Sequence, residues 1–251
     1  MNSIKKKIFI GGMVLCLLFS SGIVFGEKLV TPDPKDLMEK MDKTNCGYTD
    51  QEMEVRMVVG DKKYEFTMYQ KGEEKRFIRF RSSEMKDMTT LVEDANNVYV
   101  YLPGYKKVRR VAVHAMNQTF AGSDFSFDDM ATAKWGPICN VSYEKEDAEN
   151  WYLRCVPKDT TKGGYTYAII GVAKDDYRQT RIEYFDNKND SIKVLEAKQP
   201  IMFPSGVRRN SIITMTDSRT GHQTRLEILN FKSNQGLKDD MFTVRQLQWN
   251  R

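Results

Sequence analysis

The sequence predicts a mainly β protein built on a single, strongly curved antiparallel sheet of about eleven strands, with a few short helices. Three observations support this fold class. From Met53 onward, apolar and polar residues alternate with period two, as they do in strands with one buried face. Turn-forming pairs such as Gly60-Asp61 and Pro103-Gly104 separate the alternating runs. A helical pattern is confined to two short segments, residues 34–43 and 123–133.

The first 26 residues are expected to form a secretory signal. Lys5, Lys6 and Lys7 precede an apolar run that ends near Gly26, which is the order of features in a cleaved signal peptide. The alternative is an uncleaved membrane anchor, although the glycines and serines in the run weaken it as a membrane span. We therefore expect an exported mature domain from residue 27 to residue 251.

A helix is expected to open the mature domain, in the segment TPDPKDLMEKMDK. Asp33 is a typical N-cap, and Pro34 suits the first helical position. The apolar residues Leu37, Met38 and Met41 fall on one face of this helix.

The first two strands are predicted to form a hairpin whose apolar residues face a cavity. Every second residue on both sides of the Gly60-Asp61 turn is apolar, and the chain is rich in methionine, with 14 residues. Methionine is flexible and adapts to irregular partners such as acyl chains, although an ordinary core is the alternative. The candidate cavity residues are Met53, Val55, Met57, Tyr64, Phe66, Met68, Val98 and Val100.

The same signals predict a series of further strands after this hairpin. They are expected at residues 75–82, 88–94, 97–102, 107–112, 135–145, 150–157, 165–175, 178–186, 191–199, 206–217 and 222–232. The tail GLKDDMFTVRQLQ is expected to form a short helical turn or a last strand. No repeat or linker divides the chain, so we expect one domain, with a packed two-layer sandwich as the alternative to a sheet around a cavity.

The stretch CNVSYEKEDAENWYLRC predicts a hairpin that turns near Asp147. A turn centred there places Cys139 opposite Cys155, and export would permit a disulfide between them. Cys46 is then left as a buried free thiol.

The sequence contains no recognisable catalytic motif. The two histidines are far apart, and neither a nucleophile elbow nor a phosphate-binding loop is present. We therefore expect neither an enzyme nor a metal or cofactor site.

The charges of the chain are nearly balanced. The sequence has 39 Lys and Arg residues and 34 Asp and Glu residues, and three of the lysines lie in the predicted signal. This balance gives no reason to expect a nucleic-acid partner.

Residues 106–110 concentrate positive charge in Lys106, Lys107, Arg109 and Arg110. Such a run is typical of an edge strand that is protected against pairing with another sheet. The alternative is a cationic rim that makes peripheral contact with an anionic membrane or with the acidic patch of a partner.

The stretches VYVYLPGYKKVRRV and FAGSDFSFDDM, together with the C-terminal LKDDMFTVRQL, resemble the LolA-like family of outer-membrane lipoprotein-sorting proteins. This resemblance implies a half-open antiparallel β-barrel with short helices over its mouth. It implies that the protein carries the acyl chains of a lipid or lipoprotein in an apolar cavity through the periplasm. It also implies an inner-membrane transporter or an outer-membrane acceptor as protein partners, and no enzymatic activity.

Within this motif we expect a structural latch at the barrel mouth. Gly122 permits a tight corner, and Ser123 or Asp124 is expected to cap the turn that follows. The nearby arginines are expected to pair with Asp124 or Asp128. The latch candidates are Arg109, Arg110, Phe120, Gly122, Asp124, Phe125 and Phe127.

The leading interpretation is therefore a periplasmic lipid or lipoprotein carrier. Two alternatives on the same fold stay open at this point. One is a surface-exposed or secreted binding module that resembles an adhesin. The other is an envelope sensor that binds lipid and signals to a protein partner.

Overall fold

A computed structural model describes residues 31–161 and 164–249 of the chain. The predicted signal, residues 1–26, lies outside the described residues. Within them the strands form one antiparallel sheet of 13 strands, which correspond to the first hairpin and the eleven further strands expected from the sequence. The strands are β1 (Asp50–Val59), β2 (Lys62–Lys71), β3 (Lys75–Phe80), β4 (Thr89–Asp94), β5 (Asn97–Leu102), β6 (Lys107–Arg110), β7 (Cys139–Glu146), β8 (Asn150–Pro157), β9 (Tyr167–Ala173), β10 (Gln179–Phe185), β11 (Ser191–Met202), β12 (Arg208–Asp217) and β13 (Gln223–Ser233).

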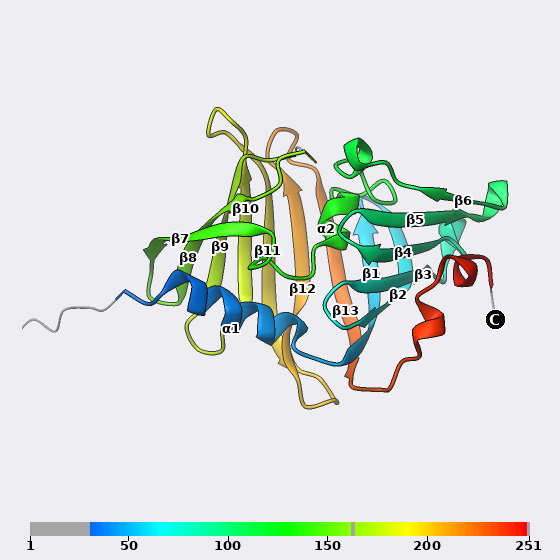
Figure 1. Cartoon of the computed structure of the whole chain (residues 1–251), viewed down its shortest axis with the longest axis horizontal. Coiled ribbons are helices and arrows are strands. Elements are labelled where there is room, and N and C mark those ends of the chain that lie inside the picture. The colour runs from blue at the N-terminus through cyan, green and yellow to red at the C-terminus, as the bar shows by residue number, and fades with distance from the viewer. Residues whose placement is uncertain (1–30, 162–163, 250–251) are drawn as a thin grey trace, which may run out of the picture. The chain divides into compact units, whose positions relative to one another are not determined.

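The order of the strands in the sheet is β6-β5-β4-β3-β2-β1-β13-β12-β11-β10-β9-β8-β7. The first and last strands therefore pair with each other in the middle of the sheet, with β2–β6 on one side and β7–β12 on the other (Figure 1). In the described part of the chain, β6 and β7 are the two edges and do not pair, so the sheet does not close. The predicted half-open barrel is confirmed.

The β1–β2 hairpin has the predicted register. Val55 lies opposite Phe66, and Met57 lies opposite Tyr64. These side chains are buried because they share the inner face of the sheet. The turn between the strands contains Gly60 with a φ of 56°, a left-handed conformation that glycine adopts without strain.

Two helices lie over the inner face. In α1 (Pro34–Cys46), the Asp33 side chain accepts a hydrogen bond from the Lys35 N–H at 2.9 Å, which confirms the predicted N-cap. The predicted apolar face of α1 is buried in the main core. The second helix, α2 (Phe127–Ala131), is shorter than expected and packs into the same core (Figure 1). No helix among the described residues is long and apolar enough to cross a membrane.

The C-terminal tail covers the outer face of β2–β6. It forms two short 3₁₀ turns, Asp239–Met241 and Val244–Gln248, in agreement with the predicted helical turn. Its Phe242 and Leu247 pack against Phe77. Because Phe77 precedes an inward-facing residue in β3, its side chain points to the opposite face of the sheet.

The β7–β8 hairpin differs from its predicted register. Val141, not Cys139, lies opposite Cys155, so the prediction is wrong by two residues. The position of the turn explains this difference in register. Asp147 accepts hydrogen bonds from the N–H groups of Glu149 and Asn150, and this centres the turn beyond Asp147.

The predicted disulfide is also wrong, because both thiols are free and buried. Cys139 and Cys155 nevertheless lie within hydrogen-bond distance of each other. This hydrogen bond, together with burial, raises the pKa of the Cys155 thiol. Cys46 is buried and free as expected, and its thiol donates to the carbonyl of Ala133.

Candidate ligand-binding cavity

A cavity of about 200 Å³ lies between the inner face of the sheet and the C-terminal parts of α1 and α2. Its lining is mostly apolar and comes from both halves of the sheet. The apolar lining residues are Met53, Val55, Phe66, Met68, Phe125, Met130, Ala133, Trp135, Ile182, Tyr184, Leu195, Ala197, Ile213, Leu226 and Ile228.

Half of the cavity residues proposed from the sequence line this space, namely Met53, Val55, Phe66 and Met68. Met57, Tyr64 and Val100 are buried in the same core but do not line the cavity. Val98 belongs to a smaller neighbouring cluster that includes Met116.

The size of the cavity limits what it holds without rearrangement. An apolar cavity of roughly 150 Å³ is enough for benzene, whereas pockets for larger ligands measure about 300–1,000 Å³. The cavity therefore accommodates part of an acyl chain as it stands. A longer chain requires the lining to move, and Met53, Met68 and Met130 are the flexible side chains in it.

The cavity is basic near the C-terminal turn of α1. Arg76 of β3, Arg178 just before β10, and Arg208 and Arg209 of β12 line it there. None of the four was predicted to line a cavity, and for Arg76 the sequence favoured a solvated strand face, which its burial contradicts. A usable signal was present for Arg76, because it falls on the same face of β3 as the buried Ile78.

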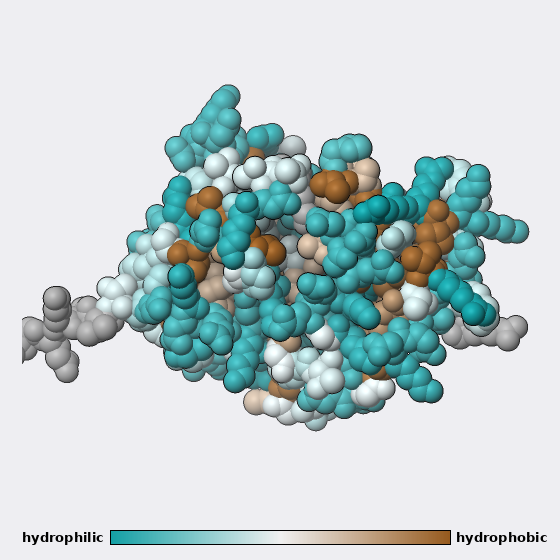
Figure 2. Space-filling view, viewed as in Figure 1, coloured by the Kyte–Doolittle hydropathy of each residue, from teal (hydrophilic) through white to brown (hydrophobic). Residues whose placement is uncertain are grey.

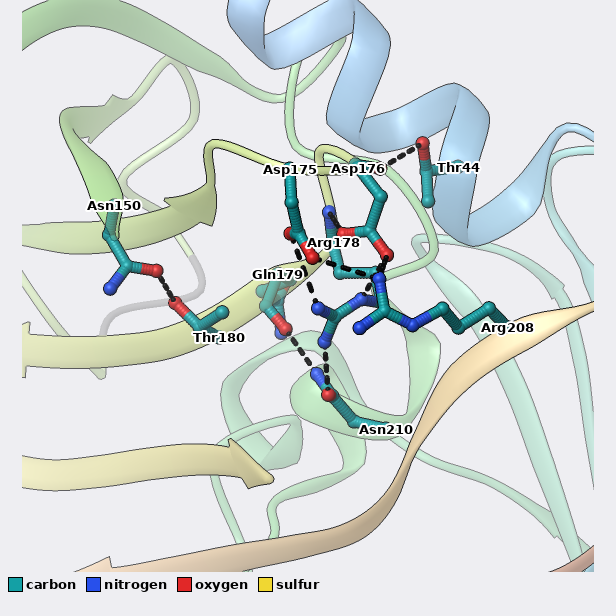
Figure 3. Close-up of polar contacts among 9 residues, drawn as sticks. All are labelled: Thr44, Asn150, Asp175, Asp176, Arg178, Gln179, Thr180, Arg208 and Asn210. Atoms are coloured by element: carbon teal, nitrogen blue, oxygen red, sulfur yellow. Dashed lines mark hydrogen bonds and ion pairs between the residues drawn. The ribbon is translucent and has the colours of Figure 1, made fainter. Parts of the chain in front are cut away.

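Two of these four arginines are neutralised by acids in the β9–β10 turn (Figure 3). Arg178 forms an ion pair with Asp176 and donates to the side-chain oxygen of Asn210 at 2.6 Å. Arg208 lies 2.8 Å from Asp175 and 2.9 Å from Asp176. The hydrogen bond with Arg208 lowers the pKa of Asp175.

The other two arginines have neutral partners. Arg76 donates to the side-chain oxygen of Gln70 at 3.2 Å and to the carbonyl of Met130 at 2.5 Å. Arg209 donates to the carbonyl of Asn45 at 2.8 Å. Burial lowers the pKa of both guanidinium groups.

The predicted latch residues come together, but their partners differ from those expected. Phe120 lies between Phe80 and Phe127, with ring centroids 5.9 Å and 5.7 Å away. Phe125 is buried in the same core, and Gly122 forms the corner with a φ of 71°. The aromatic part of the latch therefore anchors the loop over the inner face.

The predicted pairing of Asp124 with the basic strand is wrong. Asp124 accepts from the hydroxyl of Thr224 at 2.6 Å, and its carboxylate lies 2.8 Å from Nδ1 of His222. Arg110 instead donates to the side-chain oxygen of Asn97 on the neighbouring strand at 2.6 Å. Arg109 lies over the ring of Tyr105. The loop carries Asp124 toward β13, away from the edge strand β6.

The predicted cap is also displaced. Ser126, rather than Ser123 or Asp124, is the N-cap of α2 and forms a capping box with Asp129. Ser123 stabilises the preceding turn, since its hydroxyl accepts from the N–H of Phe125 at 3.2 Å. Asp129 also forms an ion pair with Lys193 of β11.

The basic run near residue 107 lies on β6, an edge of the sheet, as the sequence predicted. Lys106, Lys107, Arg109 and Arg110 are exposed. The face viewed in Figure 2 is mostly hydrophilic, with small and separate hydrophobic patches. Among the described residues, no group of three or more His, Cys, Asp and Glu side chains could hold a metal ion.

Several solved structures share this fold. A Vibrio parahaemolyticus domain, provisionally described as an outer-membrane lipoprotein-sorting protein, matches with a TM-score of 0.77 and 19% identity, covering 86% of this chain and 98% of its own. A DUF1329 family protein from Desulfovibrio piger ATCC 29098 matches with a TM-score of 0.76 and 23% identity, over 86% of this chain and 100% of its own.

A LolA superfamily protein from Nitrosomonas europaea also shares the fold, with a TM-score of 0.69 and 17% identity, over 86% of this chain and 100% of its own. The half-open barrel with its internal cavity is thus the LolA-like fold, as the motifs implied. Residues 72–249 match the model of a family described as "Uncharacterized protein", and the chain belongs to that family. No curated relative matches it in sequence.

Proposed function

We propose that this protein is an exported carrier that holds the acyl chains of a lipid or lipoprotein in its cavity during transfer to, or at, the outer membrane. The observation that supports this most directly is the mostly apolar cavity, which is lined by the sheet and by the C-terminal parts of α1 and α2. The LolA-like fold gives the same expectation, because its relatives include lipoprotein-sorting proteins.

Burial of apolar surface is the force that would hold such a chain. Each methylene group transferred from water into the cavity contributes about 0.8 kcal/mol. Movement of the flexible lining residues would widen the space without breaking the sheet, because strand pairing is carried by the backbone. No covalent chemistry is needed for this function.

The cover of the cavity is held by polar contacts that leave the apolar lining intact. Asp42 of α1 accepts from the N–H groups of Trp135 and Gly136 at 3.0 Å and 2.9 Å. These contacts join α1 to the segment that leads into β7. These contacts thus hold α1 in place over the cavity, while the flexible side chains of the lining can adapt to the cargo.

Mass spectrometry of organic extracts from the gently purified protein tests the proposal directly, because it identifies any bound lipid. Uptake of the neutral dye Nile red, and its displacement by added lipid, gives a second measurement. Met68→Glu places a charge on a half-buried position of the cavity lining and is expected to reduce dye uptake at least tenfold. Phe66→Glu makes the same change at a fully buried position.

Leu229→Glu is the matched control, since Leu229 is 46% exposed on β13. It is expected to leave dye uptake unchanged. Thermal melting of all three variants separates lost binding from lost folding. A wild-type protein that contains no lipid and takes up no dye would contradict the carrier function and leave a packed binding module in its place.

We further propose that residues 1–26 direct export, that the mature domain begins at residue 27, and that it acts in the periplasm. The exposed basic edge strand β6 would make peripheral contact with anionic membranes. Cell fractionation distinguishes this proposal from surface exposure: a carrier is released with the periplasmic contents, whereas a surface module is accessible to protease on intact cells.

A further inference from the structure

Two guanidinium groups in the cavity lining, those of Arg76 and Arg209, have no role in holding an acyl chain. Arg76 is 7% exposed and Arg209 is partly buried. Among the described residues, no aspartate or glutamate forms an ion pair with either of them. Their partners are amide oxygens and backbone carbonyls, together with the Cys46 thiol for Arg76 and the Tyr48 hydroxyl for Arg209. The Arg209 guanidinium also lies 4.7 Å from the centre of the Phe231 ring. Arginine is almost never buried as fully as Arg76 without a charged partner.

A short chain of amides joins the two groups. Arg209 contacts the side-chain oxygen of Gln51 at 3.5 Å, and the Gln51 amide donates to Gln70 at 2.7 Å. Arg76 donates to the same oxygen of Gln70. The two positive charges therefore lie close together, and the proximity of Arg209 contributes to lowering the pKa of Arg76.

The backbone carbonyls that these arginines contact satisfy only part of their hydrogen-bonding capacity. Met130 and Asn45 lie in the last turns of α2 and α1, where carbonyl groups lack partners within the helix. Each guanidinium has five N–H donors in a planar fork. Donors therefore remain on both groups, next to the cavity.

The remaining charges of the cavity do not cancel this pair. Arg178 and Arg208 are neutralised by Asp175 and Asp176. Asp129 lines the cavity too, but it forms an ion pair with Lys193. The two positively charged guanidinium groups, both partly removed from water, thus lie at one end of an apolar cavity. A bound anion would stabilise this arrangement.

We propose that Arg76 and Arg209 bind the anionic group, a phosphate or a carboxylate, of a ligand whose acyl chain fills the cavity. This inference rests on the proposed carrier function and adds the chemical class of its cargo. Guanidinium groups bind both anions through paired, charge-assisted hydrogen bonds. The cargo would enter with its chain along the apolar lining and its charged group at the end nearest α1.

A pair of ligands with the same chain tests the proposal. In Nile red displacement, 1-lauroylglycerol 3-phosphate is compared with 1-lauroylglycerol, which lacks only the phosphate. We expect the phosphate-bearing ligand to bind at least about tenfold more tightly to the wild type. Lauric acid compared with 1-dodecanol tests the carboxylate in the same way.

Three variants test which arginines produce the preference for the anionic ligand over the neutral one. Arg76→Gln and Arg209→Gln each remove one charge, and each is expected to reduce the preference for the anionic ligand over 1-lauroylglycerol to about threefold or less. Arg208→Gln is the matched control. It removes the same charge from the same cavity, but at a position already balanced by acids, so the preference should persist.

The outcomes separate this inference from the carrier function. Equal binding of the charged and neutral ligands by the wild type overturns the anion site and leaves the carrier intact, whereas binding of neither overturns the carrier. Inorganic phosphate alone, at millimolar concentration, should neither displace the dye nor raise the melting temperature. If phosphate raises the melting temperature of the wild type but not that of Arg209→Gln, the site binds free anions and the assignment to a lipid is wrong. If Arg76→Gln does not fold, Arg209→Gln decides the question.

Discussion

The carboxylate of Asp50, in the first residue of β1, accepts a hydrogen bond from the backbone N–H of Gly236 at 2.9 Å. The same carboxylate accepts from the N–H groups of Gln235 and Leu237, at 2.7 Å and 3.0 Å. One buried side chain thus holds three successive residues just after β13. It directs the tail onto the outer face of the sheet.

Asp50→Ala should therefore release the tail. We expect a loss of about 1–3 kcal/mol in the free energy of unfolding, because buried backbone donors lose their acceptor. Hydrogen exchange and limited proteolysis around Phe242 should show the release directly. Asp239→Ala is the control, because Asp239 is an exposed acid in the same tail and its ion pair with Lys71 contributes little. A tail that stays protected in Asp50→Ala would contradict this assignment.

The second prediction concerns the corner before α2. Asp124→Ala should lower the free energy of unfolding by about 1–3 kcal/mol, since the Thr224 hydroxyl and the His222 ring lose a partly buried partner. Arg110→Gln should change it by less than about 0.5 kcal/mol, because Arg110 is exposed and does not contact Asp124. Chemical denaturation of both variants measures the two values. Equal losses would favour the pairing first expected from the sequence.

The third prediction uses pH. In the β7–β8 turn, a hydrogen bond from Tyr152, followed by two from backbone N–H groups, lowers the pKa of Asp147 from its usual value of 3.8 to about 2. The folded state then binds fewer protons than the unfolded state, so the stabilising contribution of this carboxylate is complete above pH 4. It is lost as the pH falls from about 4 through about 2.

Melting temperatures measured between pH 5 and pH 2 test this sign. Asp147→Asn should lose less stability over that interval than the wild type, because its side chain does not titrate. Asp61→Asn is a suitable comparison, since Asp61 is an exposed residue in the β1–β2 turn. If the melting temperature falls equally with pH in the wild type and in Asp147→Asn, the prediction is wrong.

The fourth prediction distinguishes a cargo cavity from a packing defect. Ala197 of β11 lines the cavity, so Ala197→Leu should place its added carbons in empty space. We expect stability within about 1 kcal/mol of the wild type and a clear reduction in Nile red uptake. Ala168→Leu is the matched control, because Ala168 is fully buried in the same core without lining the cavity. Overpacking there should cost about 1–3 kcal/mol. Similar stability losses in both variants would show that the space is not available to a ligand.

Much of the sheet could be predicted because its signals are local. In β1 and β2, the alternation around Val55 and Phe66 and the intervening glycine turn fix both the strands and their register. The cap of α1 by Asp33 is equally local. The β7–β8 register could not be predicted, since it depends on which backbone N–H groups Asp147 accepts from.

The candidate site was harder to predict because it depends on long-range contacts. Asp124 and Thr224 are 100 residues apart, and only the fold brings them together. Arg76 has the alternation of an inward-facing residue, but its charge favoured a solvated position. Its burial depends on acceptors supplied by Met130 and Gln70. The cavity itself results from incomplete filling of the interior, which a pattern of apolar residues does not reveal.

The pairing of β1 with β13 also sets the order in which this chain can complete its fold. Lys232 contacts Glu52 across a separation of 180 residues, so the centre of the sheet is its longest-range contact. The β1–β6 half and the β7–β12 half can each form from neighbouring hairpins, but they join only through β13. Long-range closure of this kind is slow, because the entropy of the intervening chain must be lost first. A nascent chain that lacks its last thirty or so residues would therefore hold two unjoined half-sheets, with β1 and β12 as unpaired edges that need protection until synthesis is nearly complete.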